Sequence, residues 1–79
     1  MNTLACYEHA CRRSSQRLRA DLNSELETIR NYRERVRQCE QLQEFAMAEH
    51  IREILKDEQE HLIDLATALG EDPPDPNSR

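Results

Sequence analysis

Glycine and proline, the two residues that most often interrupt helices, are nearly missing from this chain of 79 residues. Gly70 is the only glycine, and the three prolines lie together near the C-terminus, at Pro73, Pro74 and Pro76. The chain has no tryptophan, one phenylalanine and two tyrosines. Strands separated by turns would need more of these residues. Their scarcity, with 34% charged residues, predicts an all-α fold.

Other absences exclude classes of partner. The net charge of −5 argues against nucleic acid, because small nucleic-acid binders carry a basic excess. No apolar run approaches the length of a membrane span, so no membrane partner is expected. The N-terminus also lacks the apolar segment and cleavage site of a signal peptide, which predicts a cytoplasmic location.

The three cysteines, Cys6, Cys11 and Cys39, are an odd number in a chain without an export signal. Such a set does not indicate a disulfide framework. The spacing of Cys6, His9 and Cys11 matches no zinc pattern. We therefore interpret the cysteines as small buried hydrophobic residues.

Two amphipathic stripes predict two helices. The first stripe returns every three or four positions from Leu4 to Cys39, and the second runs from Met47 to Leu69. Gly70 then suits the left-handed position after a helix. We predict helices over about residues 3–40 and 44–69, within one domain of residues 1–70, and a disordered polar tail over residues 71–79.

The junction between the stripes, residues 39–44, contains no glycine or proline, so one continuous helix stays open as an alternative. An antiparallel hairpin pairs residues whose numbers have a constant sum, and a sum of about 83 matches the two stripes. It pairs Leu18 with Leu65 and Ile29 with Ile54, and it centres the turn at residues 41–42. We expect the hairpin.

The same register brings two glutamates of the buried stripes, Glu25 and Glu58, to one height. His61 lies one turn beyond Glu58 on the same helix face. Buried carboxylates are costly unless they are paired or bind a metal, and mixed carboxylate and imidazole ligands suit non-haem iron, manganese or another divalent metal. A twofold homodimer would bring four carboxylates and two imidazoles together, as in diiron four-helix bundles. We predict a metal site of Glu25, Glu58 and His61, completed by dimerisation.

A simpler interpretation stays open. A chain with eleven glutamates and three histidines contains a Glu-x-x-His pair easily by chance. The alternative function is a non-enzymatic helical-hairpin or coiled-coil oligomerisation module, without a catalytic metal, whose stripe glutamates set the register. We interpret His50 as a partly exposed helix histidine rather than a second metal site.

Two segments resemble bacterioferritins. Residues 53–65, EILKDEQEHLIDL, are similar to the last bundle helix of that family, with its Ile-Leu-x-Asp-Glu-x-x-His run. Residues 22–32, LNSELETIRNY, are similar to the first helix, in which a tyrosine follows the glutamate by seven residues. The resemblance implies a ferritin-like four-helix bundle with ferroxidase activity on Fe(II).

The resemblance also implies roles for individual residues. Glu25 matches a terminal iron ligand, Glu58 matches the glutamate that bridges two irons, and His61 matches a nitrogen ligand. Tyr32 matches a tyrosine that hydrogen-bonds near the site. Haem is not expected, because Gln59 stands where the family has its methionine ligand.

The chain departs from bacterioferritins in carrying one hairpin where they carry two. It is similar in this respect to the two-helix ferritins packaged inside encapsulin shells, which complete their site by self-association. This similarity implies an encapsulin shell as a further partner and a protein nanocompartment as an alternative location. Residues 72–79, however, contain no recognisable targeting peptide for such a shell. Residues 3–13 extend past the second helix in the hairpin register, which predicts a homo-oligomer larger than the dimer.

Overall fold

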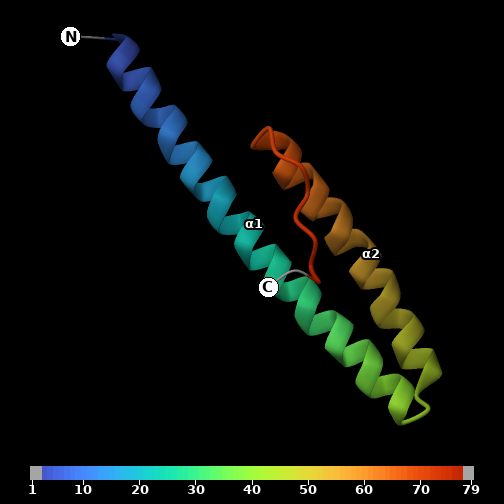
Figure 1. The fold of residues 1–79 in the computed structure, drawn as a ribbon. Helices are drawn as coiled ribbons and strands as arrows, with labels where there is room; N and C mark the ends of the chain where they lie inside the picture. The colour runs from blue at the N-terminus through green and yellow to red at the C-terminus, as the bar shows by residue number, and fades with distance from the viewer. Residues whose placement is uncertain (1–2, 78–79) are drawn as a thin grey trace.

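The computed structural model describes residues 3–77, with side chains from residue 14 onwards. Two helices, α1 (Thr3–Gln41) and α2 (Phe45–Ala68), lie side by side and antiparallel (Figure 1). The predicted all-α hairpin is confirmed, and the continuous helix is wrong. The helix ends differ from the expected positions by at most one residue. Neither described helix has a stretch apolar enough to cross a membrane.

The turn between the helices is built around Gln43, which has a φ of 61°. The Glu44 N–H donates to the carbonyl of Cys39 at 2.8 Å, and the Gln43 N–H donates to the carbonyl of Glu40 at 3.0 Å. This pair of bonds is the Schellman motif, whose left-handed residue is usually glycine. The chain therefore turns at a position that carries no glycine or proline signal.

The end of α2 uses the same motif with the usual residue. Gly70 has a φ of 71°, and the N–H of Glu71 donates to the carbonyl of Ala66 at 2.9 Å. The Gly70 N–H donates to the carbonyl of Thr67 at 2.9 Å. The prediction that Gly70 ends the second helix is confirmed.

A thin apolar core lies between the helices. Ile29 is fully buried, and the core cluster consists of Leu22, Ile29, Leu62 and Ala66, with Leu26, Leu55, Leu65 and Leu69 packed against it. Each helix contributes one stripe, because a helix with a single neighbour can bury only one side. Other apolar side chains stay open to solvent, among them Leu42, Phe45, Met47 and Ile63.

Helix α1 is the longer helix, with 39 residues against 24 in α2. At the helical rise these are about 58 Å and 36 Å long. The N-terminal part of α1 therefore projects past the end of α2, as expected for residues 3–13, and the molecule is 64 Å long (Figure 1). The interpretations of Cys6, His9 and Cys11 fall outside the described side chains.

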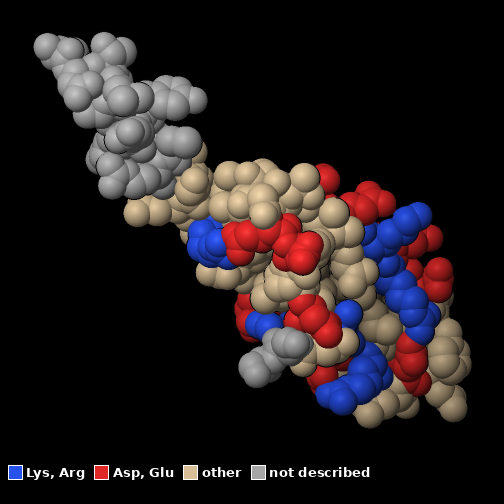
Figure 2. Space-filling view, turned by 45° about the horizontal axis from the view of Figure 1, so that its top comes forward, with Lys and Arg blue, Asp and Glu red and all other residues tan. Residues whose placement is uncertain are grey.

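The C-terminal segment, residues 71–77, runs back along α1 (Figure 1). Arg30 Nε donates to the carbonyl of Pro76 at 3.1 Å, and Arg33 donates to Asn77 Oδ1 at 2.6 Å. Arg19 forms an ion pair with Glu71. Residues 71–77, which the sequence predicts to be disordered, therefore lie against α1, because the arginines of that helix supply donors to their oxygens. On the face seen in Figure 2, basic and acidic side chains lie interleaved.

The turn geometry predicts that Gln43→Gly stabilises the hairpin. Glycine adopts a positive φ without the steric penalty of a Cβ, so the free energy of unfolding should rise by about 0.5–1 kcal/mol. The matched control is Gln38→Gly, inside α1, which should lower it by about 1 kcal/mol. Urea unfolding followed by circular dichroism at fixed protein concentration measures both. Destabilisation by both variants would contradict the turn.

Candidate metal centre

The two stripe glutamates sit directly on the core. Glu25 lies on α1 between two buried residues, Leu22 three positions before it and Ile29 four positions after it. Glu58 lies on α2, four residues before the buried Leu62. Residues three and four apart share a helix face, so the core packing itself brings both carboxylates to the interface between the helices. Both glutamates are half-buried.

His61 joins the two carboxylates from the next turn of α2. One donor atom from each of Glu25, Glu58 and His61 lies within 4.8 Å of the other two, and His61 Nδ1 is 3.8 Å from Glu58 Oε2. Donor atoms that bind one metal ion lie at most about 4 Å apart. Small side-chain rotations would therefore bring all three donor atoms within bonding distance of a single ion. Within residues 14–77, this is the one group of three or more acidic, histidine or cysteine side chains whose donor atoms come so close.

One atom of the group has no partner. Glu25 Oε1 is buried and accepts no hydrogen bond. A buried carboxylate oxygen without a donor costs free energy, and a bound cation would remove that cost. Carboxylate and imidazole donors are also the ligand types that iron and manganese accept. The donor set and the unpartnered oxygen therefore both fit a divalent cation.

The group opens on one side into a hollow that sequence reasoning missed. Its lining consists of Asp21, Ser24, Glu25, His61, Asp64 and Leu65. The His61 side chain, which is 62% exposed, is therefore accessible from solvent. Asp21 is four residues before Glu25, and Asp64 is three after His61. Both aspartates lie one helical turn from an expected ligand, so the helical spacing is the sequence signal that points to them.

Tyr32 lies apart from this group. It is half-buried and lines a different hollow, with Thr28, Asn31 and Arg35. Its seven-residue separation from Glu25 is about 10 Å along α1. The expected hydrogen bond of its hydroxyl near the metal site stays a prediction.

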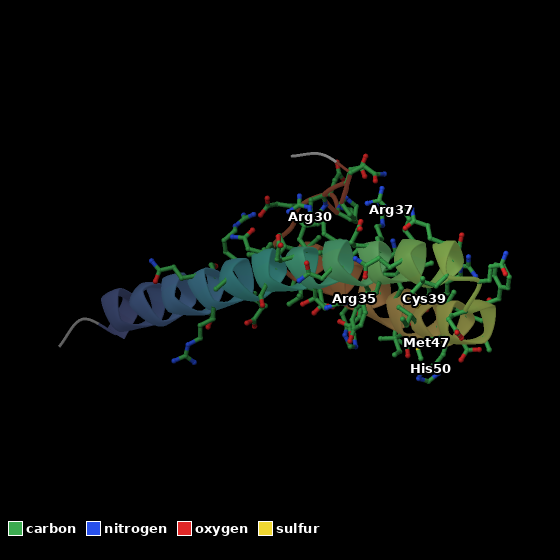
Figure 3. All side chains as sticks on the ribbon, turned by 90° about the horizontal axis from the view of Figure 1, so that it is seen from below. Arg30, Arg35, Arg37, Cys39, Met47 and His50 are labelled. Atoms are coloured by element: carbon green, nitrogen blue, oxygen red, sulfur yellow. The ribbon has the colours of Figure 1, made fainter. Side chains whose placement is uncertain are left out.

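His50 and Cys39 lie towards the turn, in the same part of the hairpin as Met47 (Figure 3). His50 is exposed, in agreement with its interpretation as a surface histidine. Cys39 is a half-buried free thiol, so it is less buried than the expected core position. Neither belongs to the group of Glu25, Glu58 and His61.

A family model for the ferritin-like domain matches residues 8–73. This range includes α1 from residue 8 onwards, all of α2 and all three candidate ligands. The chain belongs to the ferritin-like family. No solved structure gives a significant match to it. Diiron bundles of the ferritin-like type take one glutamate from each of two helices and a Glu-x-x-His pair from each of the other two. This ferritin-like hairpin contains one such glutamate, Glu25, and one Glu-x-x-His pair, Glu58 and His61.

The unpartnered oxygen predicts that Glu25→Met stabilises the metal-free protein. Methionine keeps the length of the side chain and removes the buried acceptor, so the free energy of unfolding should rise by about 1–3 kcal/mol. The control is Glu27→Met, whose side chain is 59% exposed and which should change stability by less than about 0.5 kcal/mol. Thermal unfolding in the presence of a chelator measures both. If Glu25→Met is no more stable than the control, the unpartnered Glu25 oxygen does not lower the stability of the metal-free protein.

Proposed function

We propose that this protein binds and oxidises Fe(II), as a ferroxidase whose substrate site is formed by Glu25, Glu58 and His61 of two chains. The convergence of these three side chains from two helices, with one carboxylate oxygen buried and unpartnered, carries the proposal. Membership of the ferritin-like family supports iron handling as the class of function.

Charge balance supports a dimeric site. One hairpin offers two carboxylates and one imidazole, which is too few donors and too little charge for a pair of divalent ions. Two copies related by a twofold axis offer four carboxylates, whose negative charge equals the positive charge of two Fe(II) ions. This set is the ligand count of a diiron bundle. Manganese or another divalent metal would fit the same donors.

Apolar side chains that stay exposed to solvent on α2 support the same dimer. Ile54 and Met47 share the helix stripe of Glu58, four and eleven residues before it, and the Met47 side chain is 57% exposed. A second hairpin seated on the metal-binding face would cover this stripe and make a four-helix bundle. The proposed partners are therefore a second copy of the chain and, by its likeness to packaged two-helix ferritins, an encapsulin shell.

The reaction needs little from the protein beyond position and charge. Each Fe(II) gives up one electron, so a pair supplies the two electrons that, with two protons, reduce O₂ to hydrogen peroxide. The carboxylates favour the higher charge of Fe(III) over that of Fe(II), which lowers the free energy of the oxidised product. The hollow beside His61, with Asp21 and Asp64, attracts the incoming cation.

Iron titration tests the proposal. Anaerobic addition of Fe(II) should saturate at about one iron per chain, and admission of air should then produce the near-ultraviolet absorbance of Fe(III) faster than in buffer. Glu58→Ala should abolish both results, because it removes a ligand from the group. Glu60→Ala, an exposed carboxylate two residues away on another face of α2, should leave both unchanged.

Two other results would overturn the ferroxidase. Wild-type protein that binds no iron above background would favour the non-enzymatic oligomerisation module. Protein that binds iron through Glu58 but oxidises it no faster than free solution would be a structural metal protein.

A further inference from the structure

A second polar cluster lies on another side of α1, under the C-terminal segment. It forms a hollow lined by Arg30, Arg33, Glu34, Arg37, Pro76 and Asn77. Arg30 follows Glu25 by five residues, which places it about 140° around the helix from that carboxylate. Figure 3 shows Arg30 and Arg37 on the same side of α1 as the C-terminal segment. A hairpin seated on the metal-binding face would therefore leave this hollow accessible.

The hollow is positive in a chain that is negative overall. Its lining carries three guanidinium groups and one carboxylate, Glu34, in a protein of net charge −5. Glu34 pairs with Arg37, but both side chains are about half exposed or more, so the pair is weak and exchangeable. Glu27 lies 3.6 Å from Arg30, outside the lining. Asp75 is occupied as the acceptor of the Asn77 N–H at 2.9 Å.

Two of the arginines donate hydrogen bonds to neutral groups of the C-terminal segment. The Arg30 side chain is 19% exposed, and its Nε donates to the backbone carbonyl of Pro76. Arg33 donates through one terminal nitrogen to the side-chain amide of Asn77. The side-chain amide of Asn77 orients the Arg33 guanidinium without cancelling its charge. Since a guanidinium has five N–H donors, Arg33 keeps most of its donors for a ligand.

We propose that this hollow binds a small phosphate-type oxyanion. Arg33 and Arg37 would hold its oxygens, and the partly buried Arg30 forms the wall of the hollow beside them. Forked guanidinium donors match the oxygens of phosphate, and charge-assisted bonds of this kind are among the strongest in proteins. The C-terminal segment closes one side of the hollow, which suits a single oxyanion better than a nucleic acid. Because Asn77 contacts Arg33, the bound anion also fastens the C-terminal segment to α1.

Titration with inorganic phosphate tests the site, using iron-free protein at constant ionic strength. Wild-type protein should show saturable binding by calorimetry. Arg33→Gln with Arg37→Gln should weaken binding by about tenfold or more, because two charge-assisted contacts are lost. The matched control is Arg35→Gln with Arg52→Gln, which removes the same charge from outside the hollow and should change affinity by less than about twofold.

A nitrogen-15 spectrum gives the second measurement. The backbone amide of Asn77 should shift with added phosphate in wild type and in the control pair, but not in the Arg33 and Arg37 pair. Equal weakening by both pairs would show general charge attraction and overturn the site, as would the absence of saturable binding by wild type. Circular dichroism confirms that each variant is folded. The site needs no iron, so failure of the iron titration would leave this result unaffected.

Discussion

The carboxylate of Glu25 is the constraint on which the rest of the structure depends. One of its oxygens is buried against the core with no hydrogen-bond donor, although Leu22 and Ile29 beside it pack normally. A folded chain tolerates this cost when a cation supplies the missing interaction. One donor atom from each of Glu25, Glu58 and His61 lies within 4.8 Å of the other two, so a single cation would have three side chains as ligands. The core and the candidate metal centre are therefore parts of one helix interface.

The small core of the hairpin supports the proposed dimer. Two helices bury one stripe each, and the core they make is thin, with large apolar side chains such as Met47 left open. A core of this size rarely gives much stability without metal or oligomerisation. The proposed dimer would supply both the missing apolar burial and the missing ligands. A second hairpin would cover the exposed apolar stripe and double the number of metal ligands. Metal binding and assembly would then stabilise each other by linkage.

The sequence predicted the features that follow from helical periodicity. The two apolar stripes predicted both helices. Their register predicted that Glu25 and Glu58 lie close together, because packing one stripe against the other restricts how far the helices can shift along their axes. The register placed the turn at residues 41–42, next to its observed position at Gln43. The left-handed conformation of Gln43 could not be predicted, since a glutamine gives no signal for it in the sequence. The docking of residues 71–77 was missed because it depends on three separate arginines of α1, and each contact is weak alone.

The mass of the protein in solution, with and without Fe(II), tests the central claim most directly. Sedimentation of wild-type protein should show a dimer, or a multiple of dimers, that is favoured when Fe(II) is added under anaerobic conditions. Glu25→Ala should lose this response, because its chains can no longer complete the shared site. A monomer that binds iron with undiminished affinity, or an assembly whose mass ignores both iron and Glu25, would contradict a metal centre shared between two chains.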